Sequence, residues 1–247
     1  MIDLSTARLN RLLATLKHHD LELLLPSFTV HEYPAGKILQ EAGSDVHYAW
    51  FPLGSAAASF VVPADANHLV DAALIGCEGA VGGLVSWGRL PAYARAHVQF
   101  GGRFLRLPLK ALGEARTQSP AIANWLSRYA DCLVAQLFQS AACNASHTIA
   151  QRLARWLIAT QDRIGNGEII ITQEQLGEML GVGRSFINRS LRQFGAAEIL
   201  GSRRRRIIIL DQARLEAIAC DCNTRIRNHF DTVLEGVYPH EPATVAA

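Results

Sequence analysis

The chain has 247 residues, of which 49% are hydrophobic and 19% are charged, and its formal net charge is +2. This length suffices for one large or two ordinary domains with buried cores, and the composition excludes a disordered chain. No apolar run reaches the length of a membrane span, and the first residues show no signal-peptide cleavage site, so we expect a cytoplasmic protein with no membrane partner.

The charge is uneven along the chain. Residues 1–146 hold 11 basic and 11 acidic side chains, whereas residues 147–211 hold 10 arginines and 6 acidic side chains, a net charge of +4. Residues 212–247 hold 3 basic and 5 acidic side chains, a net charge of −2. The basic excess in the middle segment favours contact with phosphate there.

The first half of the chain predicts a short helical entry and then a β domain. Leucines recur at helical spacing in residues 5–25. From residue 28 to about residue 109, short apolar clusters alternate with Gly- and Pro-containing turn signals, and residues 61–62, 69–75 and 97–100 are credible strands. This pattern is typical of an all-β sandwich or barrel, which can enclose a small-molecule pocket.

Helical spacing returns beyond Pro108. A helix from about Pro120 to Cys143 would span roughly 35 Å, which is too long for one small barrel to cover easily. Its apolar seam steps by 4, 3, 4 and 4 residues through Ile122, Leu126, Tyr129, Leu133 and Leu137. We favour a dimerisation helix with this seam as the dimer interface, and the alternative is a long helix that lies across its own domain.

The next segment begins with a break near residues 144–146, where Ser146 or Thr148 can cap a new helix. Residues 168–171 read as a strand that leads into the capping residue Thr172. Residues 172–194 then predict two short helices joined by a tight turn at Gly181-Val182-Gly183. Such a helix-turn-helix places its second helix in the major groove of DNA, although an ordinary helical hairpin gives the same local pattern.

Four consecutive arginines, Arg203 to Arg206, follow the two helices and lie between short apolar segments. This order predicts a β-hairpin wing with arginines at its tip. Guanidinium groups suit a DNA backbone because they remain charged and present a planar fork of donors to phosphate. The candidate DNA-binding residues of the whole segment are Thr172, Gln173, Arg184, Ser185, Asn188, Arg189, Arg203, Arg204, Arg205 and Arg206.

The cysteines form an odd and scattered set that does not resemble a disulfide framework: Cys77, Cys132, Cys143, Cys220 and Cys222. The Cys220-Asp221-Cys222 sequence suggests a metal site completed by His229 or His240. Zinc sites usually show two separated ligand pairs with two to four residues inside each pair. We therefore expect ordinary reduced thiols and no metal.

The order of β domain, long helix and winged helix-turn-helix resembles the Crp/Fnr family of bacterial transcription regulators over nearly the whole chain. The motifs that carry this resemblance are residues 152–157, 180–184, 189–191 and 208–211. The resemblance implies that Arg184, Ser185 and Arg189 occupy positions that contact bases and phosphates. Ser185 stands where many members have Glu, and because serine discriminates poorly between bases, we expect a different operator.

The resemblance does not extend to the effector site. Members that bind cyclic nucleotides carry a Gly-Glu pair followed by Arg-Ser/Thr-Ala, but here Gly82 precedes Gly83, the expected arginine falls near Tyr93, and Arg95 has the wrong offset. No cysteine precedes Cys77, as an iron–sulfur member would require. We expect neither effector and no cofactor, and the sequence does not identify a small-molecule effector.

These observations predict an α+β protein with four parts: a double-stranded β-helix (jelly-roll-like) sensor domain at residues 1–117, a dimerisation helix and hinge at 118–146, a winged helix-turn-helix at 147–220 and a C-terminal tail at 221–247. We expect a non-enzymatic regulator that binds a two-fold symmetric site in double-stranded DNA as a homodimer, with RNA polymerase as a further partner. The alternative is a ligand-binding or enzymatic β-barrel protein whose C-terminal domain binds protein or RNA.

Overall fold

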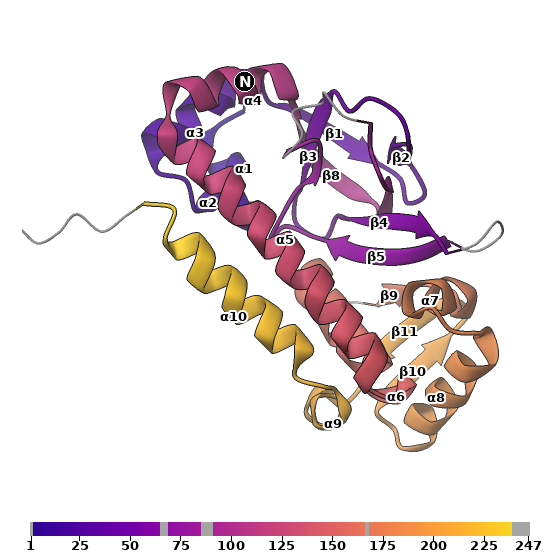
Figure 1. Ribbon diagram of the computed structural model, residues 1–247. Coiled ribbons are helices and arrows are strands. Elements are labelled where there is room, and N and C mark those ends of the chain that lie inside the picture. Colours follow the sequence, from indigo (N-terminus) through magenta and orange to yellow (C-terminus); the bar gives the residue numbers. More distant parts are fainter. Residues whose placement is uncertain (1, 65–68, 85–90, 166–167, 239–247) are drawn as a thin grey trace, which may run out of the picture.

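The computed structural model of the chain describes residues 2–64, 69–84, 91–165 and 168–238 (Figure 1). A β domain and a smaller mixed domain lie toward opposite ends of one long helix, and the last helix runs back along that helix (Figure 1). None of the helices in the described ranges combines the length and the hydropathy that a membrane span needs.

The predicted helical entry is three short helices and one turn of 3-10 helix. Asp3 and Asn10 are the N-caps of α1 and α2, because their side chains accept hydrogen bonds from backbone N–H groups in the first turn of each helix. The elements are α1 (Leu4–Ala7), α2 (Arg11–Ala14), α3 (His18–Leu24) and η1 (Leu25–Ser27).

The β domain consists of two four-stranded antiparallel sheets, with strand orders β1-β8-β3-β6 and β2-β7-β4-β5. Most successive strands alternate between the two sheets, which is the arrangement of a double-stranded β-helix. The predicted fold class is therefore confirmed. The strands are β1 (Thr29–Tyr33), β2 (Ile38–Gln40), β3 (Tyr48–Pro52), β4 (Ala57–Pro63), β5 (Leu69–Ile75), β6 (Val81–Gly82), β7 (Arg95–Phe100) and β8 (Gly102–Pro108).

Helices α4 (Leu109–Gln118) and α5 (Pro120–Ser146) follow the last strand. Ser119 caps α5, and Pro120 occupies its first turn, where a missing N–H costs nothing. The helix runs three residues beyond the predicted end at Cys143 and stops before His147, whose backbone is extended.

The C-terminal domain has the predicted winged helix-turn-helix order, with a three-stranded sheet ordered β10-β11-β9. Thr148, one of the two predicted caps, forms a capping box with Gln151 at the start of the first helix. The elements are α6 (Ile149–Ile164), β9 (Ile169–Ile170), α7 (Gln173–Leu180), α8 (Arg184–Ala196), β10 (Leu200–Arg203), β11 (Arg206–Ile209) and α9 (Gln212–Ile218).

Within the predicted C-terminal tail, residues 222–235 form helix α10 (Cys222–Glu235), an element not predicted from the sequence. Its apolar side chains Ile226, Phe230 and Leu234 are buried against the core that includes α5. The two helices run antiparallel (Figure 1), with Arg128 donating to the carbonyl of Val233 at 2.8 Å. The apolar spacing of α10 is that of an amphipathic helix, whose stability comes from burial of one face.

The predicted dimer seam on α5 needs correction. Ile122, Leu126 and Tyr129 are buried inside the chain's own core, where Tyr129 meets Phe230 of α10 edge to face. These three side chains cannot face a second copy in this conformation, and Leu133 also packs partly against this core. The hydroxyl of Tyr129 also hydrogen-bonds to the backbone N–H and carbonyl of Ala80 in the β domain, so this part of the seam lies between α10 and the β domain of the same chain. Only Leu137 of the predicted set stays exposed.

Candidate nucleic-acid interface

The α7–α8 pair is built by specific backbone features. Thr172 and Gln175 form a capping box that starts α7, and Gly181 ends it in the left-handed conformation, with φ of 61°. Gly177 lies inside α7, where an added Cβ would meet the carbonyl oxygen of Val182 at 2.7 Å. The close approach of the turn to α7 therefore requires glycine at this position.

Helix α8 has a buried face and a polar exposed face. Ile187, Leu191 and Phe194 pack into the core of the C-terminal domain. Three of the predicted DNA-binding side chains, Arg184, Ser185 and Arg189, are not part of that core, and all three are exposed. Because the apolar stripe fixes how α8 rotates about its axis, the polar residues of its first turn face outward.

The wing is a tight hairpin with arginines at its tip. Arg203 and Arg206 are paired across β10 and β11, and Arg204 and Arg205 form the turn between them. Arg205 adopts φ of 62°, and its carbonyl oxygen accepts a hydrogen bond from the backbone N–H of Ile171. This bond ties the wing to the chain that enters α7.

A hollow of about 380 Å³ lies between the wing, the start of α7 and the start of α8, and we call it the wing groove. Seven of the ten predicted DNA-binding residues line it: Thr172, Gln173, Arg184, Arg203, Arg204, Arg205 and Arg206. The structure thus brings together residues from three elements that the sequence placed in one segment. Their contact with DNA stays a prediction.

The wing groove is strongly basic. Among the described residues that line it, five arginines face one carboxylate, that of Glu174. Arg206 forms an ion pair with Glu168, which precedes β9, and this pair orients its guanidinium. The other wing arginines are exposed. Such a concentration of guanidinium groups attracts a polyanion over a Debye length of about 8 Å at physiological salt.

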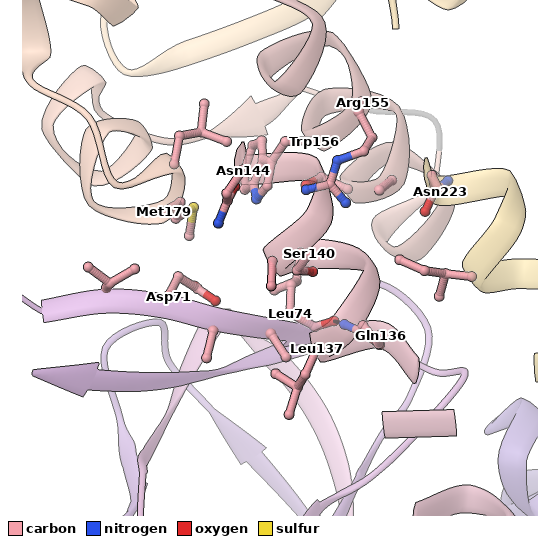
Figure 2. A pocket seen from close by; sticks show the side chains of 18 of the residues that line it. Asp71, Leu74, Gln136, Leu137, Ser140, Asn144, Arg155, Trp156, Met179 and Asn223 are labelled. Carbon is pink, nitrogen blue, oxygen red and sulfur yellow. Dashed lines mark hydrogen bonds between the residues drawn. The ribbon is translucent and has the colours of Figure 1, made fainter. Parts of the chain in front are cut away.

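A second cavity, of about 250 Å³, lies between the β domain and the C-terminal domain, and we call it the interdomain cavity. Figure 2 shows Asp71 of β5 pointing into it, with Met179 of α7 opposite and Asn144 and Arg155 on its helical wall. Burial raises the pKa of Asp71 to about 7, because a charged carboxylate loses its water there. The cavity is lined by side chains of both domains, with β5 on one side and α7 on the other.

Two of the residues considered for cyclic-nucleotide binding, Tyr93 and Arg95, lie within the described part of the chain. The Arg95 Nε donates to Glu41 at 2.8 Å, so its charge is already paired, and the side chain of Tyr93 is exposed. Residues 85–90, which separate the two parts of this motif, lie outside the described residues.

Sequence reasoning missed one constellation of possible metal ligands. The structure brings Cys143, His147, Cys220 and Cys222 together, with their ligand atoms all within 4.8 Å of one another. We expected ordinary reduced thiols from the sequence, but three of the cysteines lie side by side. The sequence did contain a signal for this site. Cys143 and His147 are separated by three residues, so they form a second ligand pair beside Cys220 and Cys222. His229, one of the two proposed partners, instead contacts Asp131 at 3.0 Å, and His240 lies outside the described residues.

Comparisons with known proteins agree with this architecture. Residues 151–218 match the model of the Crp-like helix-turn-helix domain. No curated protein sequence matched the chain.

Several solved structures share the fold. FixK2 from Bradyrhizobium japonicum is 18% identical over 78% of this chain and 98% of its own, with a TM-score of 0.67. The c-di-GMP-responsive global regulator CLP of Xanthomonas campestris is 14% identical over 79% of this chain and 100% of its own, with a TM-score of 0.63. A transcriptional regulator of the CRP family from Thermus thermophilus is 16% identical over 76% of this chain and 95% of its own, with a TM-score of 0.62. The resemblance to Crp/Fnr regulators is confirmed, by the domain match for residues 151–218 and by these structures for the fold.

Proposed function

We propose that this chain, whose helix-turn-helix is Crp-like and whose fold is that of Crp/Fnr regulators, controls transcription by binding a two-fold symmetric site in double-stranded DNA as a homodimer. The observation that carries the proposal is the wing groove, in which five arginines from the wing and from α8 converge beside the start of α7. The wing arginines hold phosphates and position the protein, while the exposed side chains of α8 read base edges.

The side chains of α8 and of the wing have different roles in this proposal, because the two elements reach different parts of the DNA. Arg184 and Ser185 occupy the first turn of α8, the part of a recognition helix that reaches base edges in the major groove. Arg204 and Arg205 lie at a hairpin tip, where they reach a backbone that flanks the groove. Arg184 therefore contributes to sequence preference, and the wing contributes affinity for any duplex.

The dimer contact proposed here lies on the face of α5 that this chain leaves uncovered. Val134, Leu137 and Phe138 are exposed, and the side chain of Phe138 has 72% of its surface in solvent. Residues 134 and 138 are one helical turn apart, so a second α5 packed there would bury both. Leu137 retains the role predicted for it, whereas Ile122, Leu126 and Tyr129 are replaced by these outward side chains.

The regulator works without a cyclic nucleotide in this proposal, because Arg95, the arginine considered near the expected position, is paired with Glu41. A signal that alters β5 acts through the interdomain cavity, where Asp71 faces Met179 of α7 (Figure 2). Any such signal shifts the protein between two states only by binding them with different affinity.

The proposal is tested by titrating the full chain into fluorescent random-sequence duplex DNA at two salt concentrations, with light scattering of the free protein. We expect a dimer mass and DNA affinity that falls steeply with salt, since bound arginines release counterions from the duplex. Phe138→Asp separates the dimer, and the matched control Tyr93→Asp, an exposed aromatic on the β domain, does not. A monomeric wild type would contradict the dimer, and preference for single-stranded RNA over the duplex would support the alternative class.

A further inference from the structure

The end of α5 meets the start of α10 at a cluster of four side chains that the proposed function does not use, and we call it the hinge cluster. Cys143 lies in the last turn of α5, and His147 follows directly after that helix. Cys220 lies in the short connection between α9 and α10, and Cys222 is the first residue of α10. Two segments separated by more than seventy residues therefore supply one group of ligand atoms.

The distances within the hinge cluster fit one metal ion. The Sγ atoms of Cys143 and Cys220 are 3.5 Å apart, and the Sγ of Cys222 lies 3.6 Å from Nδ1 of His147. Ligand atoms about 2.3 Å from a zinc ion at the corners of a tetrahedron are separated by about 3.8 Å along each edge. A cluster of several metal ions needs some ligands further apart, because they bind different ions, whereas here all four ligand atoms lie within 4.8 Å of one another.

The surroundings of the hinge cluster also suit a metal with thiolate ligands. Three thiolates and one neutral imidazole around Zn²⁺ carry a net charge of −1. The positively charged guanidinium groups of Arg152 and Arg155 lie near Cys143, where they can offset the negative charge of a loaded site. The Nε atom of each arginine is buried and has no hydrogen-bond partner among the described residues. The Nε2 of Gln139 donates to the Sγ of Cys222 at 3.2 Å, the kind of outer hydrogen bond that orients a ligand.

Burial divides the cluster into an inner and an outer half. Cys143 and Cys222 are buried, whereas Cys220 and His147 are half-buried, so an ion can enter from the side of the hinge. The two buried ligands are both thiols, and sulfur is a soft ligand, which favours zinc over the oxygen-preferring Mg²⁺ and Ca²⁺.

We propose that Cys143, His147, Cys220 and Cys222 bind one zinc ion in a tetrahedral site that fastens the hinge after α5 to the start of α10. The site is structural, because protein side chains fill all four positions. It fixes α10 along α5 and fixes the point from which α6 and the helix-turn-helix continue. The proposal does not depend on DNA binding, because it is tested by the metal content of the protein and by the absorption spectrum of bound metal.

The test measures zinc in the full-length protein, purified under reducing conditions without added metal and then incubated with Zn²⁺ and passed through a desalting column. We expect one zinc per chain. Replacement by Co²⁺ should give thiolate-to-cobalt charge-transfer absorption and the intense visible bands of a tetrahedral ion. Both signals report on the site directly, whether or not the protein binds DNA.

The variants Cys143→Ser and Cys220→Ser are expected to lose the stoichiometric zinc and the charge-transfer bands, while the matched control Cys77→Ser keeps both. His147→Gln, at a half-buried position that tolerates substitution, should weaken zinc affinity while the fold remains intact by circular dichroism. Gln139→Leu, which removes the hydrogen bond to Cys222, should weaken zinc affinity by about 10- to 100-fold.

Three results would overturn the proposal. One is wild-type protein that takes up neither Zn²⁺ nor Co²⁺ under reducing conditions. Another is uptake that persists in Cys143→Ser and Cys220→Ser at the wild-type level. The last is a Cys143–Cys220 disulfide in protein handled under reducing conditions, shown by peptide mass mapping, because two oxidised sulfurs cannot serve as thiolate ligands.

Discussion

The wing groove and the hinge cluster are assembled in opposite ways. Every residue of the wing groove comes from one stretch, residues 171–207, whose helices, turn and hairpin are local structures. The hinge cluster joins residues 143–147 to residues 220–222, which meet only because α10 runs back along α5. A site built from one stretch of sequence follows from periodicity and turn residues. A site built from segments far apart in the sequence forms only in the complete fold.

The two kinds of assembly predict different effects of mutation. Changes in the wing groove should alter DNA binding and leave the free energy of unfolding nearly unchanged, because its arginines are exposed. Changes where distant segments meet should alter the free energy of unfolding first.

The largest effect is expected at Trp125, a fully buried residue of α5 that joins distant segments. Its ring stacks on Phe51 of β3, and its Nε1 donates to the carbonyl of Leu12 at 3.1 Å. Trp125→Ala should lower the free energy of unfolding by about 3–5 kcal/mol, since it leaves a large cavity in the core and removes the hydrogen bond of the indole to Leu12. Urea denaturation measures this loss. Tyr93→Ala, at an exposed aromatic, is the control. An equal loss in both variants would contradict the claim that residues joining distant segments carry the stability of the fold.

A pH-dependent effect of a few kcal/mol is expected at Asp71, which lies between the two domains. Burial raises its pKa from the ordinary value of 3.8 to about 7. Between these values the folded chain holds a proton that the unfolded chain releases, so the free energy of unfolding falls as pH rises from about 4 to 7. Asp71→Asn removes this slope. Urea denaturation of both proteins at pH 5 and pH 8 measures this slope. If the free energy of unfolding changes equally with pH in both proteins, the pKa of Asp71 is not raised.

A smaller effect, confined to DNA binding, is expected from the tip of the wing. The double variant Arg204→Ala, Arg205→Ala should weaken binding by about 10- to 100-fold on every duplex, because each arginine gives up a charged interaction with phosphate. The slope of log affinity against log salt should become shallower by about 1.8, because each arginine–phosphate interaction contributes about 0.9 to it. Binding titrations on specific and random duplexes at several salt concentrations measure both. An unchanged slope would mean that the wing does not touch the backbone.

The smallest effect on general affinity is expected at Arg184, at the first residue of α8. Arg184→Ala should cost about 1–3 kcal/mol on the selected site and much less on random duplex, because this arginine binds a base edge. Competition between the two duplexes measures the difference. Arg192→Ala, at an exposed position further along α8, is the matched control. Equal losses on both duplexes would assign Arg184 to phosphate instead.

The same contrast explains what the sequence predicted correctly. The strands of the β domain, the capping residues Thr148 and Thr172 and the turn at Gly181 follow from local chemistry, and the structure has them near the expected positions. The predicted seam on α5 had the right spacing for helix packing. Spacing does not say which helix covers a seam, so α10 was not foreseen as the partner of Tyr129 and its neighbours.

The candidate metal ligands escaped prediction for the same physical reason. Cys220 and Cys222 were separated from any partner by sequence distance, and the nearest histidines downstream were poor guides because α10 carries His229 toward Asp131 instead. Cys143 was read as the end of a helix rather than as a ligand. Only the antiparallel path of α10 along α5 brings its first residue, Cys222, to the end of α5.

The central claim, that the chain reads DNA as a symmetric dimer through the wing groove and α8, is tested most directly by selecting bound sequences from a pool of randomised duplexes with the full-length protein. The account predicts enrichment of one two-fold symmetric site whose half-sites lie about one helical turn apart. Failure to enrich any sequence, or enrichment of a single asymmetric half-site, would contradict it.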